Sequence, residues 1–363
     1  MTTLRDIFTA FGPEYLARSP HLPTAHRQVI SAIQHCRSGH YGHSLLQCQS
    51  CGGQHRVQHS WGNRHCPQCQ QHKTQQWFHS HLEKQLPGPH FRITCTVPET
   101  LRPLIRSHQC LAYHAMFTAS SQALTRLATD ERFIGTDLPG FTGVLHTWGR
   151  QLQYHPHIHD IVPGGGLSKA RTTWRPSRAN FFVPVKALSP IYRALFKEEM
   201  HQAGLLEHID PQVWTIPWHV HSQANHHGSS AFTSLAPSVC KVAISNRRIV
   251  SLADRTVTCT YRKVGSARPR TARLDVVEFR RRFLQHVLPH GCMKVRHCGF
   301  LQASCAVPLT TIRLLIVQGH PGEGPPPPRP PSPPRPARCP TCGAPMRVLM
   351  RLWTSHHGFV DTS

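Results

Sequence analysis

The segment from His155 to Gly166 constrains the fold more than any other part of the chain. It reads His-Pro-His-Ile-His and continues as Asp-Ile-Val-Pro-Gly-Gly-Gly. Side chains alternate across a strand, so the pattern predicts His157 and His159 on one face and Ile158 in the core behind them. Neutral imidazoles on one face suit a divalent cation, which can polarise a scissile phosphate. With 30 histidines in the chain, a His-rich strand without ligands stays open as the alternative.

The charge of the chain points to a polyanionic partner. Lysine and arginine number 41 against 17 acidic residues, giving a formal charge of +24. Nucleic acid is the leading candidate for such a basic protein. A membrane surface is disfavoured because no run of about 18 apolar residues occurs and no amphipathic lysine-rich helix stands out. The amino terminus does not resemble a signal peptide, so we expect a cytoplasmic, nucleoid-associated bacterial protein.

The order of the expected elements predicts an α+β fold. Strands and helices follow one another irregularly rather than in βαβ units, which favours a largely antiparallel sheet. The helices are expected at 5–35, 99–127, 189–204 (with Ser189 as N-cap) and 276–288, and the strands at 91–97, 141–148, 151–162, 214–222, 241–245 and 255–263.

The composition divides the chain into four parts. We expect a helical and zinc-binding domain at 1–88 and a nuclease-like domain at 89–318. A Pro/Arg-rich linker at 319–338 and a short Cys-x-x-Cys tail at 339–363 follow. The proline run in the linker predicts an extended spacer.

Two Cys-x2-Cys pairs in the amino-terminal part indicate a structural zinc site. They are Cys48/Cys51 and Cys66/Cys69, separated by 14 residues in a segment with little aliphatic content. Paired thiolates at this spacing bind metal in a reducing compartment, and two pairs complete a tetrahedral Zn2+ site. The neighbouring basic and amide side chains suit contact with nucleic acid, although a purely structural module is compatible with the same pattern.

Other cysteines and histidines are not assigned to this site. Cys36, His40 and His43 are interpreted as ordinary helix-end and loop residues. The tail pair, Cys339 and Cys342, has two thiolates and could hold a metal only with partners from elsewhere.

Four segments in this order closely resemble transposases of the insertion sequence 91 family. The resemblance covers most of the chain, to about residue 317, and rests on segments 64–70 (RHCPQCQ), 145–149 (LHTWG), 155–168 (from HPHIH to PGGGLS) and 242–248 (VAISNRR). It implies a rolling-circle transposase of the His-hydrophobic-His nuclease class, with a small antiparallel sheet and flanking helices. Such enzymes cleave single-stranded DNA at transposon ends with a tyrosine and transfer the strand through a covalent 5′ phosphate.

The resemblance gives roles to particular residues. His157 and His159 match the metal-binding histidines, with Mg2+ or Mn2+ as the catalytic cation. A third ligand is required, and His146 or Gln153 could supply it. A second string, His219-Val220-His221, matches no metal site of the family and is not assigned.

The chain departs from the family at the expected nucleophile. Ser234 and Ser238 stand where relatives carry tyrosines, and no tyrosine lies between Tyr192 and Tyr261. A serine hydroxyl is shorter in reach and less acidic than a phenol, so covalent catalysis is expected to suffer. Segment 234–245 should still approach an exposed concave face that carries the histidines.

Further departures from the family pattern resemble mutations accumulated in a copy that is not under selection. Trp61 stands where relatives have cysteine, and cysteine stands where aromatic residues are expected. These cysteines are Cys240, Cys259, Cys292 and Cys298.

Three functions therefore remain in competition. The first is an active transposase with an unrecognised nucleophile, and the second is an inactive relative that only binds DNA through its zinc module and basic surface. The third is a metal-dependent hydrolase that activates water, which would need a carboxylate; Asp160, the nearest one, falls on the opposite strand face. No small-molecule substrate is indicated, and the oligomeric state stays open.

Overall fold

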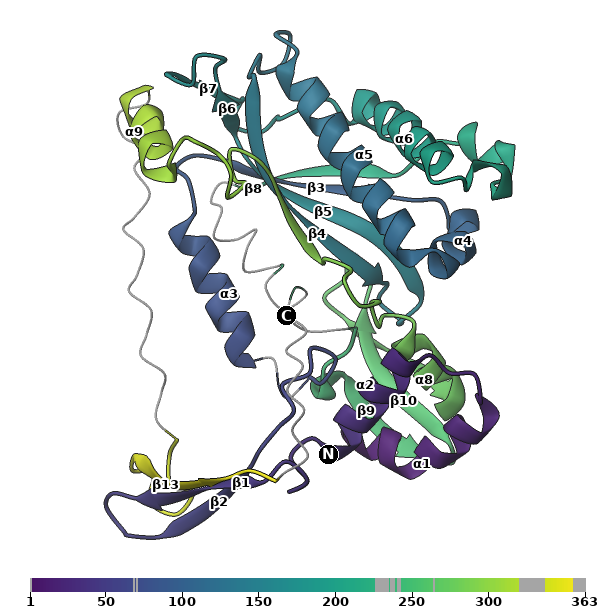
Figure 1. Ribbon diagram of the computed structural model, residues 1–363, viewed down its shortest axis with the longest axis vertical. Coiled ribbons are helices and arrows are strands. Elements are labelled where there is room, and N and C mark those ends of the chain that lie inside the picture. Colours follow the sequence, from purple (N-terminus) through teal and green to yellow (C-terminus); the bar gives the residue numbers. More distant parts are fainter. Residues whose placement is uncertain are drawn as a thin grey trace.

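The computed structural model describes residues 2–67, 69, 71–225, 235, 239, 243–263, 265–319 and 337–354, without the side chains of 71–73. It consists of helices and three antiparallel sheets (Figure 1), which confirms the predicted fold class.

A seven-stranded sheet forms the centre of the molecule. Its path runs β7-β6-β4-β5-β3-β8, and β12 pairs with β4. The strands are β3 (His90–Thr96), β4 (Leu138–Trp148), β5 (Tyr154–Pro163), β6 (Gly165–Leu167), β7 (Trp174–Pro176), β8 (Val220–Asn225) and β12 (Val295–Gly299). The strands predicted at 141–148 and 151–162 correspond to β4 and β5, which pair antiparallel, and β5 lies between β4 and β3.

Helices cover one face of this sheet. The apolar side chains of β3, β4 and β5 on that face share the largest hydrophobic core with α5 and α6. The elements on this side and around its edge are η1 (Glu99–Leu101), α4 (Arg102–Ser107), α5 (Gln109–Thr129), α6 (Val185–Gln202), η2 (Leu206–His208) and η3 (Pro211–Trp214). A disulfide joins Cys110 of α5 to Cys292.

Some predicted boundaries of helices and strands are wrong. Helix α6 begins before Ser189, because the Ser189 hydroxyl donates to the carbonyl of Trp218 instead of capping a helix. The helix expected at 99–127 breaks at His108, whose φ and ψ are −120° and 49°. The strand expected at 241–245 is irregular in its described part, where Ala243 has a φ of 54°.

A second core joins the amino-terminal helices to residues far along the chain. Helices α1 and α2 pack with α8 and a three-stranded sheet, so this core does not follow the predicted boundary near residue 88. Its elements are α1 (Leu4–Arg18), α2 (Thr24–His35), η4 (Asn246–Arg248), β9 (Ile249–Ala253), β10 (Thr256–Arg262), β11 (Pro269–Asp275) and α8 (Val276–Leu284).

Arg280 of α8 ties this core together. Its guanidinium donates to the carbonyls of Ile7 and Phe8 at 2.6 and 2.7 Å, and to that of Phe11. A second side chain, Gln34 of α2, also donates to the Phe8 carbonyl, at 2.9 Å. Burial lowers the pKa of Arg280 to about 10, which leaves the side chain charged at neutral pH.

The third sheet joins the two ends of the chain. Strand β13 pairs with β1, which pairs with β2. The strands of this sheet are β1 (His43–Cys48), β2 (Gln54–Gln58) and β13 (Met346–Leu352). Along the chain, α3 (Gln71–Glu83) follows β2 and α9 (Leu309–Gly319) precedes β13. Among the described residues, no helix is long and apolar enough to cross a membrane.

We predict that Arg280→Met lowers the free energy of unfolding by about 2–4 kcal/mol, because it removes the charge-assisted hydrogen bonds between a buried guanidinium and three carbonyls of α1. The neighbouring Arg281 bonds Glu278 at the surface, so Arg281→Met should cost less than about 1 kcal/mol. Urea denaturation of both variants measures the difference. Equal losses would contradict the role of Arg280.

Candidate functional site

The alternation along β5 places two histidines on the sheet face opposite the α5–α6 core. Ile158 is fully buried in that core, between His157 and His159, which project to the other side. The predicted same-face arrangement is therefore confirmed. Gly165 and Gly166 allow the close chain packing that follows β5, because a Cβ on Gly166 would lie 2.2 Å from Thr136 Oγ1.

The neighbouring strand adds a third imidazole. His146 of β4 is the cross-strand partner of His157. One ring nitrogen from each of His146, His157 and His159 lies within 4.8 Å of the others. Gln153, the other candidate third ligand, accepts a hydrogen bond from the backbone N–H of Gln151 in the hairpin turn through its Oε1.

Hydrogen bonds orient two of the rings toward a common point. The Nε2 atoms of His157 and His159 are 3.1 Å apart. Their Nδ1 atoms contact the carbonyl of His155 at 2.7 Å and the hydroxyl of Thr94 at 2.8 Å. Two nitrogens bound to one cation lie about 3.0–3.4 Å apart at metal–nitrogen distances of about 2.1 Å. The group thus has both the ligand spacing and the supporting contacts of a metal site.

The three rings are more enclosed than the sequence led us to expect. They pack edge to face on one another, and Trp148 stacks on His146 with ring centroids 5.1 Å apart. His157 is only 9% exposed and His159 is partly exposed, so the prediction that both imidazoles lie on an exposed face is wrong for His157. The third ring, His146, is 7% exposed.

Burial also keeps the imidazoles neutral. Desolvation lowers the pKa of His157 to about 4 and holds the pKa values of His146 and His159 well below the ordinary range. Neutral rings have a lone pair for a cation. The buried Nε2 of His146 has no hydrogen-bond partner among the described residues, which fits a nitrogen placed to receive one.

Asp160 belongs to the other face, as predicted. It is buried on the side of α5, where Ser120 hydrogen-bonds it, and desolvation raises its pKa to about 7. Its carboxylate is therefore not a ligand of the histidine group. The described part of the chain supplies no acidic residue to this group.

The second His-hydrophobic-His string lies two strands away from β5, on the same face of the sheet. His221 of β8 pairs with Thr94 of β3, which pairs with His159 of β5. Neighbouring strands are about 4.8 Å apart, so His221 is two strand spacings from the group. His219 and His221 are exposed and belong to none of the potential metal groups among the described residues.

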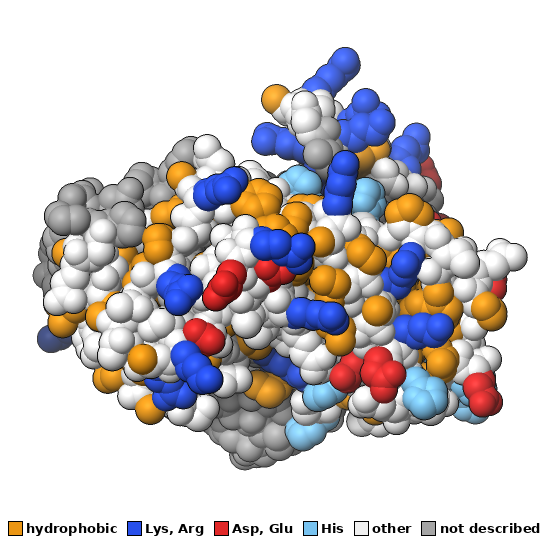
Figure 2. All heavy atoms as spheres, turned by 90° about the horizontal axis from the view of Figure 1, so that it is seen from above, with side chains coloured by type: hydrophobic (Ala, Val, Ile, Leu, Met, Phe, Trp, Pro, Cys, Tyr) orange, Lys and Arg blue, Asp and Glu red, His pale blue; other side chains and the backbone are white. Residues whose placement is uncertain are grey.

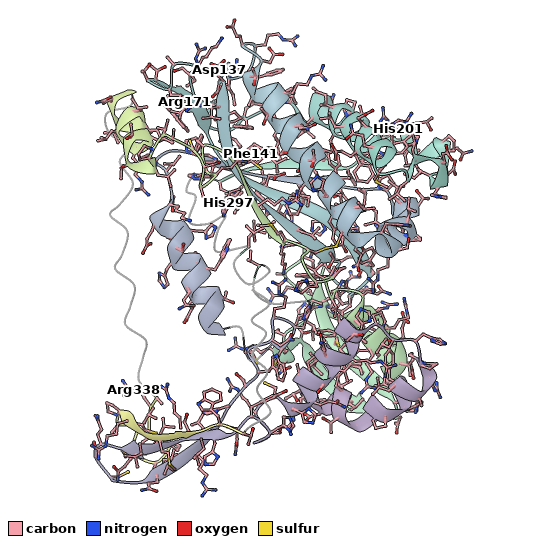
Figure 3. The ribbon with its side chains drawn as sticks, viewed as in Figure 1. Asp137, Phe141, Arg171, His201, His297 and Arg338 are labelled. Atoms are coloured by element: carbon pink, nitrogen blue, oxygen red, sulfur yellow. A yellow bond between two sulfur atoms is a disulfide. The ribbon has the colours of Figure 1, made fainter. Side chains whose placement is uncertain are left out.

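A cavity of about 220 Å3 lies on the same sheet face, where it is lined by Ile161, two residues after His159 on β5. It lies beside Thr142, Ile161 and His297, near the sheet centre where Figure 3 labels Phe141 and His297. His81 of α3 stacks on His297 with ring centroids 5.6 Å apart. The sheet face that carries the three imidazoles therefore also carries a cavity lined by the rings of His81 and His297.

The positions expected for the nucleophile, Ser234 and Ser238, lie outside the described residues. Leu235 between them is described and packs with Ile161, Trp77 and Phe78. Ile161 is two residues after His159 and shares its strand face. The expectation that this segment approaches the histidine face is therefore confirmed at Leu235.

Arg248 holds the following segment against the hairpin after β4. Its guanidinium donates to the carbonyls of Ala243, Thr260 and Arg150, the last at 2.6 Å. In the sequence, Arg248 is recognisable only as the last residue of the segment 242–248 that resembles the family. The structure shows that it links residue 243 and strand β10 to the turn between β4 and β5.

The tyrosines of the chain lie mostly in its interior. All six tyrosines of the chain are described, and five of them are buried. Tyr154 faces the core and bonds the Tyr113 hydroxyl at 2.7 Å. Tyr261 lies in β10, in another sheet.

The cysteines form two groups instead of one, which corrects the predicted zinc site. Cys48 and Cys51 lie with the tail pair Cys339 and Cys342, which the sequence pattern did not assign to the predicted zinc site. The remaining pair, Cys66 and Cys69, lies with Cys36, interpreted from sequence as an ordinary residue. The sequence could not reveal this because β13 approaches β1 from the far end of the chain.

The three-thiol group lies near the histidines. The Cys36 sulfur is 3.3 Å from that of Cys69 and 3.4 Å from that of Cys66. Arg64 and His65, which precede Cys66, line a small cavity together with Trp148 and Lys294. The cysteine module therefore packs against the strand end that carries His146.

Comparison with known proteins identifies the class. Residues 7–97 match a family model described as "Transposase zinc-binding domain", and residues 140–308 match one described as "Putative transposase". The protein is a transposase with an amino-terminal zinc-binding domain. The cysteine groups fit a structural zinc, because thiolates converge at ligand spacing.

Two relatives narrow the class to a family. The "Putative transposase y4qJ" of Sinorhizobium fredii is 33% identical over 316 residues, covering 82% of this chain and 79% of the relative. The "Transposase for insertion sequence element IS801" of Pseudomonas savastanoi is 25% identical, covering 87% and 79%. The chain belongs to the insertion sequence 91 family of transposases. No solved structure matches it.

We predict that Mn2+ binds at the histidine group and that His159→Ala abolishes this binding. Thr94→Val removes the hydroxyl that orients His159 and should weaken affinity about 10–100-fold. His221→Ala on the same face is the matched control and should leave affinity unchanged. Electron paramagnetic resonance titration of free Mn2+ measures all three. An equal effect of His159→Ala and His221→Ala would refute the site.

Proposed function

We propose that this transposase binds single-stranded DNA at transposon ends and aligns one phosphate at His146, His157 and His159 for strand cleavage and transfer. The convergence of these three neutral imidazoles on one sheet face carries the proposal. A bound divalent cation would polarise the scissile phosphate.

The surroundings of the histidines suit a phosphate backbone. Lys294 lies over the Trp148 ring at 4.9 Å, and Arg92 of β3 is bonded to Gln223 across the same face. Both cations lie close enough to contribute to the lowered pKa of His146. The cavity on the same sheet face offers ring surfaces, on His81 and His297, for a neighbouring base to stack upon.

The donor set favours Mn2+ over Mg2+ as the cation. Mg2+ prefers oxygen ligands and nearly ideal octahedral geometry, whereas imidazole nitrogens suit transition metals better. The group offers three nitrogens, and Asp160 is directed to the other face. Cleavage activity, where present, should therefore be supported better by Mn2+.

A second candidate function is DNA binding without cleavage. It is favoured by the placement of the six tyrosines, of which five are buried and the sixth lies in a different sheet. With serine at 234 and 238, the phosphate would be positioned without a phenol to attack it. We expect strand cleavage to be absent or severely reduced.

The basic surface predicts salt-sensitive DNA binding. Basic side chains are spread over the face drawn in Figure 2, among a few acidic ones, and the chain carries a formal charge of +24. Binding of a single-stranded oligonucleotide should weaken log-linearly with salt as condensed counterions are released. Fluorescence anisotropy at several salt concentrations measures this. Absence of binding at low salt would refute a nucleic-acid function.

Restoring the phenol tests the cleavage chemistry. Ser238→Tyr, alone or with Ser234→Tyr, should yield a covalent protein–DNA adduct with Mn2+. The phenolic oxygen would bond to phosphorus, the P–O3′ bond would break, and the phenolic proton would end on the 3′ hydroxyl. Denaturing gel electrophoresis of a labelled transposon-end strand detects the adduct.

Two controls separate this chemistry from chance reactivity. Ser251→Tyr adds a phenol on β9 and should give no adduct. His159→Ala in the Ser238→Tyr protein should abolish the adduct. Robust cleavage by the unmodified protein, with the phosphate on any side chain, would overturn the inactive alternative.

A further inference from the structure

Two cysteine pairs from opposite ends of the chain meet at one point. The sulfurs of Cys48 and Cys342 are 3.4 Å apart, and those of Cys51 and Cys339 are 3.8 Å apart. All four sulfurs lie within 4.8 Å of one another. This is the spacing at which four thiolates surround a single tetrahedral ion.

The two pairs have the same local backbone geometry. The N–H of Cys48 donates to the carbonyl of Gly53, and the N–H of Cys339 donates to that of Ala344, both at 2.8 Å. Each turn uses a glycine with positive φ after its second cysteine, Gly52 at 69° and Gly343 at 74°. The match indicates two knuckles built for one ion.

Backbone donors further prepare the first knuckle for a thiolate. The N–H groups of Ser50 and Cys51 point at the Cys48 sulfur from 3.4 and 3.5 Å. Such donors stabilise a negatively charged sulfur. A thiolate is the form that binds metal.

Hydrophobic packing alone gives this sheet little support. Its core consists of four buried residues, two of which are the cysteines Cys48 and Cys339; the others are Leu46 and Met346. The rest of β13 is exposed, including Val348 at 46% and Met350 at 45%. A small sheet with so little buried apolar surface needs a crosslink to hold its strands.

We propose that Cys48, Cys51, Cys339 and Cys342 bind one zinc ion, which latches the carboxyl-terminal strand β13 onto the amino-terminal hairpin of β1 and β2. The site is separate from the Cys36, Cys66 and Cys69 group, and it reaches beyond residues 7–97, where the zinc-binding family model matches.

The latch fixes both ends of the Pro/Arg-rich segment. On one side α9 is anchored, because Ile312 and Ile316 are buried in a core with Leu86 and Phe300. On the other side β13 is held by β1 in a register from His43–Leu352 to Cys48–Met346. Residues 320–336 therefore connect two fixed points while the zinc is bound.

Zinc stoichiometry of the full chain provides the first test. The double variant Cys339→Ser/Cys342→Ser should bind one zinc fewer per chain by elemental analysis. When Co2+ replaces zinc, the double variant should show weaker thiolate-to-Co2+ charge-transfer absorption than the unaltered protein. Cys305→Ser, outside every cysteine cluster among the described residues, is the matched control and should change neither. Unchanged zinc content in the double variant would overturn the proposal.

A second measurement guards against misfolding of the variant. A specific protease site placed within 320–336 of the otherwise unaltered chain allows the tail to be cut after folding. The tail fragment should co-elute with the body in gel filtration and leave when 1,10-phenanthroline removes zinc. Release without the chelator, or retention despite complete zinc removal, would also overturn the proposal.

Discussion

The side-chain alternation of β5 is the constraint on which the site depends. Ile158 and Val162 bind the strand to the α5–α6 core, and this burial fixes which residues turn the other way. His157 and His159 are thereby held on the opposite face beside His146. A shift of register by one residue would exchange the histidines with the core residues. The packing of β5 against the core therefore fixes both the position of the strand in the fold and the arrangement of the three imidazoles.

Local patterns allowed part of this to be predicted from the sequence. The period of two in β5 was sufficient to place His157 and His159 together and Asp160 opposite. His146 was one of two candidates for the third ligand, because strand register decides which residues of β4 face β5, and that register depends on the hairpin turn. The α+β class could also be predicted, because the irregular order of the expected strands and helices is itself visible in the local sequence patterns.

Contacts between distant segments were not predictable in this way. The spacing of Cys48, Cys51, Cys66 and Cys69 suggested one site, but β13 brings two further cysteines from residues 339–342, and α2 ends at a third, Cys36. Helix boundaries failed where a tertiary contact overrode local preference, as at Ser189. Likewise, α1 and α2 share a core with α8 through Arg280, which no local pattern of the amino-terminal segment reveals.

The protein combines three converging imidazoles on β4 and β5 with serine at positions 234 and 238. We propose that these imidazoles hold a divalent cation on the sheet face that binds DNA. Anomalous diffraction at the manganese edge, from crystals grown with Mn2+ and a single-stranded oligonucleotide, tests this most directly. We predict a peak at bonding distance from a ring nitrogen of His146, His157 and His159, with a DNA phosphate beside it. A fully bound oligonucleotide with no peak among these rings would contradict the account.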